Sequence, residues 1–109
     1  MQFVQQRRLI NRLLIVEDEP LVAFDNEHLL VDAGYHIVGT VDRVDHALQT
    51  IRNEPIDLVL ADVQLSDGGN GIDVAREAHS RGVPVLFVAG SCPLDARQYA
   101  VGCLRVRTH

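Results

Sequence analysis

The 109-residue sequence contains no tryptophan and only two cysteines, Cys92 and Cys103. Two cysteines are too few, and too poorly spaced, for a disulfide framework or a zinc site, which is typical of a reduced cytoplasmic protein. No apolar run reaches the roughly 20 residues that a membrane-spanning helix needs. The opening segment "MQFVQQRRLINR" also lacks the continuous apolar stretch of a signal peptide. We therefore expect a cytoplasmic protein without a membrane segment.

Lysine is absent as well, so that all ten basic residues are arginine, against fifteen acidic residues. The resulting net charge of −5 argues against nucleic acid as a direct ligand. The length suits one domain and is too short for two. We expect residues 1–11 to be an N-terminal extension and residues 12–109 to form the domain.

Apolar, β-branched runs recur at fairly even distances along the chain, as expected for strands. They are Leu13–Val16, His36–Val41, Ile56–Ala61 and Val83–Ala89, with a weaker fifth run at Cys103–Val106. Near-continuous runs of this kind are typical of parallel strands that are covered on both faces.

Helical patterns separate these runs. The first spans residues 20–34, with Pro20 in the first turn and Gly34 as the stop. The second follows Asp42 as its N-cap and has one apolar face, the third spans residues 71–82, and a short fourth spans residues 93–102. Alternating strands and helices predict an α/β fold, a doubly wound parallel sheet with helices on both faces.

Acidic residues follow two of the predicted strands. Glu17 and Asp18 come after the first run, and Asp62 comes after the third. Ligands of such sheets bind at the carboxyl ends of the strands, where these three carboxylates meet if the two strands are neighbours. Two carboxylates about 4 Å apart repel by roughly 4 kcal/mol at an effective dielectric near 20, so that the cluster predicts a cation such as Mg²⁺. Alternatively, each acid is a solvated loop residue, or Asp18 caps the helix that begins at Pro20.

A strand-end aspartate beside a metal suits one chemistry in particular, attack on phosphorus to give an aspartyl-phosphate. Other phosphate-handling classes fit less well. Phosphatases of the haloacid-dehalogenase type need a second acid two residues after the first, where this chain has Gln64. A flavodoxin follows its first strand with hydroxyl residues and glycines rather than "EDEP", and "SDGGNG" lacks the Lys-Ser/Thr ending of a P-loop.

The segments "LLIVEDEP" and "DLVLADVQLSDGGNGID" resemble the receiver domain of two-component response regulators, and the second resembles the receivers of general-stress-response regulators. The resemblance covers about residues 12–106. It implies a flavodoxin-like fold with a five-stranded sheet in the order 2-1-3-4-5. It also implies that Asp62 accepts phosphate from a histidine kinase or phosphotransfer protein, that Asp18 binds Mg²⁺ directly, that Glu17 binds it through water, and that Gln64 offers its backbone carbonyl. Such a domain signals through protein contacts and is not an enzyme.

The sequence departs from the receiver pattern at the positions that contact the phosphoryl group or report it. Ala89, followed by Gly90, stands where receivers carry Thr or Ser, although Ser91 offers a hydroxyl two residues later. Val106 stands in place of the lysine, and Cys103 in place of a switch aromatic. A charge-assisted hydrogen bond contributes roughly 1.5–3 kcal/mol, so we expect slower, less persistent or poorly transmitted phosphorylation. The alternative is a degenerate receiver that serves as a dimerisation or interaction module.

The sequence ends where the fifth helix of a receiver begins, so we expect a domain truncated after the fifth strand, without its last helix. One sheet face would then be bare and the fifth strand would be an exposed edge. We therefore predict a homodimer that forms through the side of the fourth helix and fifth strand.

Overall fold

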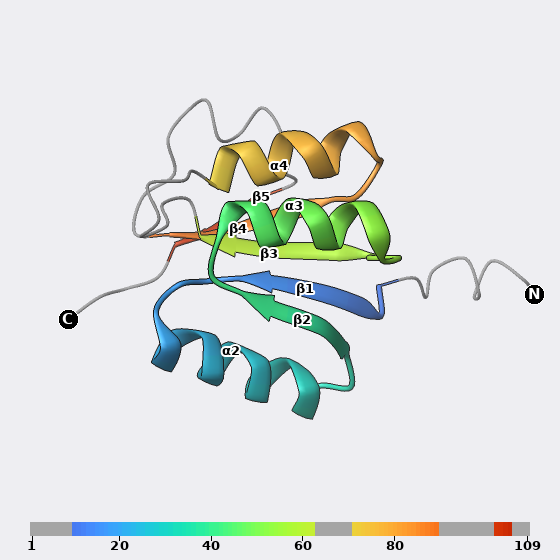
Figure 1. Cartoon of the computed structure of the whole chain (residues 1–109). Coiled ribbons are helices and arrows are strands. Elements are labelled where there is room, and N and C mark those ends of the chain that lie inside the picture. The colour runs from blue at the N-terminus through green and yellow to red at the C-terminus, as the bar shows by residue number, and fades with distance from the viewer. Residues whose placement is uncertain (1–9, 63–70, 90–101, 106–109) are drawn as a thin grey trace, which may run out of the picture.

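The computed structural model describes residues 10–62, 71–89 and 102–105, in which strands and helices alternate along most of the chain (Figure 1). The strands are β1 (Arg12–Val16), β2 (His36–Val41), β3 (Leu58–Asp62), β4 (Val85–Ala89) and β5 (Gly102–Arg105). The helices are α2 (Pro20–Asp32), α3 (Val44–Asn53) and α4 (Gly71–Ser80). No helix among these residues is long and apolar enough to span a membrane.

The five strands form one parallel sheet in the order β2-β1-β3-β4-β5. Helices α3 and α4 lie side by side on one face of the sheet, and α2 lies on the other face against β1 and β2 (Figure 1). This is the flavodoxin-like arrangement and strand order that the sequence predicts. The predicted fourth helix and the position of the last helix fall outside the described residues.

The main core lies between the sheet and the pair α3 and α4. Its fully buried members include Leu14, Val16, Val59, Phe87 and Val74. Neighbouring strand residues point to opposite faces, so that Leu13 and Ile15 are buried on the α2 side of the sheet. Burial of each such side chain stabilises the fold by roughly 1.5–3 kcal/mol.

Strand β2 departs from the expectation that the strands are covered on both faces, because its residues are only half-buried or exposed. It is the outermost strand and pairs with β1 alone among the described residues. The pairing is also irregular, since Leu13 lies opposite Ile37 and Leu14 lies opposite Gly39. Val38 is therefore an extra residue, a β-bulge, in an exposed edge strand.

The helix ends follow the sequence prediction at α2 but not at α3. Pro20 is the first residue of α2, and Gly34, at a φ of 101°, follows its end. The prediction that Asp42 caps α3 is wrong, because Arg43 occupies the N-cap position and no side chain caps the helix. Instead, the Asp45 carboxylate accepts hydrogen bonds from Arg43 Nε (3.1 Å) and from the backbone N–H of His46 (2.9 Å).

Four strands begin at residues other than the predicted ones, and β1 starts one residue earlier, at Arg12 rather than Leu13. Strand β3 starts two residues later than expected, because the Asp57 carboxylate before it accepts hydrogen bonds from the backbone N–H groups of Asn11 (2.9 Å) and Arg12 (2.8 Å). Strand β4 also starts two residues later, and β5 starts one residue earlier. Strand β3 also ends one residue later than expected, so that Asp62 is its last residue rather than the residue after it.

Candidate functional site

Three carboxylates meet at the carboxyl ends of the two central strands. Glu17 and Asp18 directly follow β1, and Asp62 ends β3. Because β1 and β3 are parallel neighbours with Val16 opposite Ala61, their carboxyl ends coincide at the same edge of the sheet. One oxygen of each of the three carboxylates lies within 4.8 Å of the others. The structure thus brings together the three acids that the sequence predicts to meet.

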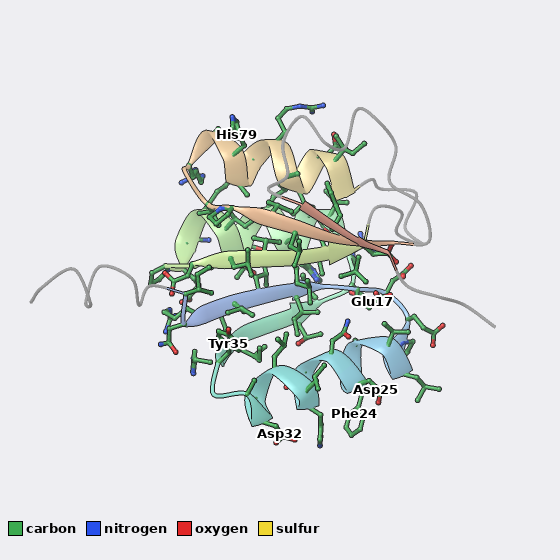
Figure 2. The ribbon with its side chains drawn as sticks, turned by 180° about the vertical axis from the view of Figure 1, so that it is seen from behind. Glu17, Phe24, Asp25, Asp32, Tyr35 and His79 are labelled. Atoms are coloured by element: carbon green, nitrogen blue, oxygen red, sulfur yellow. The ribbon has the colours of Figure 1, made fainter. Side chains whose placement is uncertain are left out.

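Glu17 is held in place by backbone hydrogen bonds on both sides. Its side chain is only 8% exposed and accepts a hydrogen bond from the backbone N–H of Glu19 to Oε2 (3.0 Å). Its own N–H donates to the carbonyl oxygen of Val41 (2.9 Å), which ties the turn after β1 to the end of β2. Figure 2 shows Glu17 at this end of the sheet, close to the first turn of α2.

The environment of Glu17 disfavours its charge. Burial is the main cause that raises the pKa of Glu17 above its ordinary value of 4.5, and the negative charges of Asp62 and Asp18 raise it further. The hydrogen bonds from the N–H groups of Glu19 and Asp18 oppose this shift, and that of Glu19 is the stronger influence. A buried carboxylate beside two half-buried ones is an arrangement that a bound cation stabilises.

Asp18 does not cap α2. The N-cap position of this helix belongs to Glu19, and no side chain makes a capping hydrogen bond there. Asp18 is half-buried and its carboxylate belongs to the acidic cluster. The alternative that this acid serves as a helix cap is therefore wrong.

The remaining predicted positions are only partly covered by the structure. Ala89 ends β4 one residue after Val88, which lies opposite Asp62, and so its backbone reaches the same edge of the sheet. Cys103 lies in β5 opposite Phe87, and its side chain is not described. Three further predicted positions lie outside the described residues: Gln64, Gly90 and Val106.

Besides the N–H of Asp18, two backbone groups contribute to the site without having been predicted. They are the N–H of Glu19, which binds the Glu17 carboxylate, and the carbonyl of Val41, which accepts from the Glu17 N–H. The "EDEP" turn contains the first group, yet its direction depends on the path of the chain into α2. The second contact needs the pairing of β1 with β2, which the sequence predicts only through the strand order.

The donor set fits a small, hard divalent cation. Carboxylate oxygens are the protein ligands that Mg²⁺ prefers, usually one or two of them together with water and phosphate oxygens. Three of them within 4.8 Å, one buried with a raised pKa, could neutralise such an ion. Glu17, Asp18 and Asp62 therefore fit a magnesium site by the chemistry of their side chains.

The family model that describes the response regulator receiver domain matches residues 13–106 of the chain. The chain belongs to this family. The sequence relatives of this receiver include the phyllosphere-induced regulator PhyR of Methylorubrum extorquens, which is 34% identical over 82 residues. That match covers 73% of the receiver and 31% of the relative.

Solved structures agree with the family and with the fold. The crystal structure of the response regulator PhyR from Brucella abortus is 34% identical, with a TM-score of 0.75 over 91% of this receiver and 42% of that chain. The solution structure of the PhyR receiver domain from Erythrobacter litoralis is 32% identical, with a TM-score of 0.76 over 88% of this receiver and 78% of that chain. The chain spans about a third of the length of its first curated relatives.

Proposed function

We propose that Asp62 accepts a phosphoryl group from a phosphohistidine of a kinase or phosphotransfer protein. A carboxylate oxygen of Asp62 attacks the phosphorus atom, the P–N bond breaks, and the imidazole leaves with a proton. The observation that carries the proposal is the convergence of three carboxylates within 4.8 Å at the tips of β1 and β3. The aspartyl-phosphate is a covalent state of a signalling domain. We do not propose that the domain turns over a substrate as an enzyme.

The acids around Asp62 would hold Mg²⁺, with Asp18 as a direct ligand, Glu17 acting through water and Gln64 contributing its backbone carbonyl. When bound, the ion supplies positive charge against the oxygens of the transferring group. The chain itself fixes the geometry, because Asp62 belongs to a strand and the backbone N–H of Glu19 holds Glu17. Asp62 therefore presents its carboxylate at a fixed distance from two further acids.

The first turns of α2 offer a contact surface for the phosphodonor protein. Leu21 and Phe24 are 73% and 57% exposed, and the helix begins directly after the acidic turn. Helix α2 carries Asp25, Glu27 and Asp32 but no arginine. The chemistry that complements this surface is an apolar helix flanked by basic residues.

A second function is supported by the altered positions of the receiver pattern. The chain contains no lysine, and Ala89, which has no hydroxyl, ends β4. A domain with these features could signal without phosphate, as an interaction module in the cytoplasm. Self-association is compatible with both functions, and we propose a homodimer in either case.

Intact mass spectrometry separates the two functions. The protein is incubated with acetyl phosphate in the presence and absence of Mg²⁺, and we expect a gain of one phosphoryl group that requires the ion. Asp62→Asn should abolish the gain, whereas Asp25→Asn, at an exposed acid of α2, should leave it unchanged. An unchanged mass of the wild-type protein under conditions in which Mg²⁺ binds would favour the interaction module instead.

A further inference from the structure

A groove of about 560 Å³ lies between α3 and the edge strand β2, outside the acidic cluster. We call it the α3–β2 groove. Its lining residues come from three elements and the residue after α3: Arg12 of β1; His36, Val38, Gly39 and Val41 of β2; His46, Gln49, Thr50 and Asn53 of α3; and Glu54. The volume falls within the range of ordinary ligand sites.

One wall of the groove is a polar face of α3. Four of its residues follow the spacing i, i+3, i+4, i+7 from His46 to Asn53 and therefore share one side of the helix. The opposite side of α3 carries Ala47 and Ile51, which are buried in the core. The side chains of Gln49 and Asn53 make no hydrogen bond with any described residue, so that their amide groups can bind a ligand.

The floor of the groove exposes the main chain of β2. Adjacent strand residues usually point to opposite faces, yet both Val38 and Gly39 line the groove because of the bulge in this strand. Gly39 has no side chain, and a Cβ placed there would meet only Leu14 Cδ1, at an ordinary 3.8 Å. Its space is therefore left open rather than filled by packing.

The groove has little net charge at neutral pH. The positively charged lining residue, Arg12, forms an ion pair at 3.6 Å with the negatively charged one, Glu54. Arg12 Nε also donates a hydrogen bond to the carbonyl of Pro55 (2.8 Å). The other lining residues are two histidines, two amides, a hydroxyl residue and three apolar or glycine residues. A charged ligand would lose hydration without gaining a free counter-charge, whereas an uncharged one is complementary.

We propose that the α3–β2 groove binds an extended, uncharged peptide segment of a partner protein as an added strand on β2. Edge strands present unpaired backbone groups that accept such a strand. Amide side chains offer both a donor and an acceptor, which match the N–H and C=O groups of a peptide. The site is separate from Asp62 and does not depend on phosphorylation.

The spacing of the two amides fits this occupant. Gln49 and Asn53 are four residues apart on α3, which separates them by about 6 Å along the helix axis. Two residues of an extended strand span about 6.6–6.8 Å. Each amide therefore meets the same side of the peptide, one repeat apart.

A blocked hexapeptide of alternating valine and threonine is the probe that tests the proposal. It is titrated into ¹⁵N-labelled protein, and we expect amide shift changes along β2 and α3. Gly39→Val fills the floor with a residue that suits a strand, since the backbone of Gly39 is not left-handed, and should weaken binding at least about tenfold. Gln49→Ala combined with Asn53→Ala, on an exposed helix face, should weaken it by a similar factor.

Two controls make the test specific. Arg52→Gln changes α3 on the side that contacts Glu77 of α4 and should leave peptide affinity unchanged. A hexapeptide N-methylated at alternate residues should lose at least about tenfold in affinity, because it lacks the N–H groups of a strand. Equal binding of this peptide, equal binding by Gly39→Val, or shift changes confined to α2 would each overturn the proposal, as would the absence of any shift change at millimolar peptide.

Discussion

At the scale of single residues, Glu17 carries a charge that its surroundings disfavour. Its pKa is raised, chiefly by burial, and two carboxylates lie within 4.8 Å. At that distance two unit charges repel by roughly 3.5 kcal/mol at an effective dielectric near 20. The N–H of Glu19 compensates for part of this repulsion, so that the folded protein without metal gains stability when Glu17 binds a proton.

We predict that Glu17→Gln stabilises the metal-free protein at pH 7, on the order of 1 kcal/mol. Because the pKa of folded Glu17 is raised, its contribution to stability is present below pH 4.5 and is lost as the pH rises through the raised value. The difference between variant and wild type should therefore grow with pH in urea unfolding. Mg²⁺ should stabilise the wild type more than the variant, and Glu19→Gln, an exposed neighbour, serves as the control.

Ala89 provides a second test at the residue scale. Its backbone ends β4 beside the strand that Asp62 ends, at the position where the receiver pattern has Thr or Ser. We predict that Ala89→Thr raises the phosphorylated fraction at steady state at least about threefold, since a charge-assisted hydrogen bond contributes roughly 1.5–3 kcal/mol. Mass spectrometry with acetyl phosphate measures it. Ala89→Val, which has the same shape without a hydroxyl, should give no increase; an equal increase would contradict the prediction.

The sequence predicts the part of the acidic site that depends only on where the strands end. Glu17, Asp18 and Asp62 converge because neighbouring parallel strands end at the same edge of a sheet. The N–H of Glu19 could not be predicted as a partner of Glu17, because its direction depends on how the chain turns from β1 into α2. Acids at strand ends are visible in a sequence, whereas the backbone groups that hold them are not.

At the scale of elements, a network of three charged residues connects α3 to α4. Glu77 of α4 accepts hydrogen bonds from Arg52 of α3 (Nε, 3.1 Å; Nη2, 3.3 Å) and from Arg81 (Nε, 2.8 Å). The hydrogen bonds from Arg52 and then Arg81 lower the pKa of Glu77 to about 2. A carboxylate with a lowered pKa in the folded state stabilises the protein above its unfolded pKa.

We predict that Glu77→Gln lowers the urea midpoint at pH 7, and that the difference from wild type disappears as the pH falls from 4.5 towards 2. The loss should be larger than for Asp73→Asn, which removes a single ion pair within α4, that of Asp73 with Arg76 at 3.1 Å. Equilibrium unfolding of both variants across this pH range measures it. A difference that stayed constant down to pH 2 would show that the Glu77 charge is not its source.

The element order was predictable because strand runs and helical faces alternate along the chain, and the sheet order was predictable through the family resemblance. What failed depends on neighbours that lie far away in sequence. Strand β2 reads as a covered strand, yet it is an edge strand whose residues are half-buried or exposed. It contacts α2, α3 and β1, and no described strand lies beyond it. Asp42 reads as a helix cap, yet α3 starts after Arg43, where Asp45 binds the first turn.

At the scale of the whole molecule, the two faces of the sheet are covered unequally. Helices α3 and α4 cover one face, whereas α2 covers only β1 and β2 on the other, among the described residues (Figure 1). On that second face Ile15 is buried beneath α2, while Leu60 and Leu86, which continue its row across β3 and β4, are only half-buried. This row is an apolar surface that a second copy of the chain can cover.

The outer side of α2 suits self-association less well than this sheet face. Asp25 and Asp32 project from that side, away from the sheet (Figure 2), and α2 carries no arginine to pair with the acids of a second copy. Two such helices would repel each other. The half-buried leucines of β3 and β4 have no charge to oppose the contact. The predicted fourth helix lies outside the described residues, and among the described ones we expect dimerisation on the sheet face and binding of a basic partner at α2.

We predict that the protein dimerises and that Leu60→Thr combined with Leu86→Thr raises the dissociation constant of the dimer about 100-fold or more. Burial of each leucine contributes roughly 1.5–3 kcal/mol, and threonine keeps the preference for strands. Sedimentation velocity over a concentration series measures the constant. His79→Thr, on the exposed side of α4 across the molecule (Figure 2), should leave it unchanged. A wild-type protein that stays monomeric at every concentration would contradict self-association, and a dimer that tolerates both leucine changes would place the contact elsewhere.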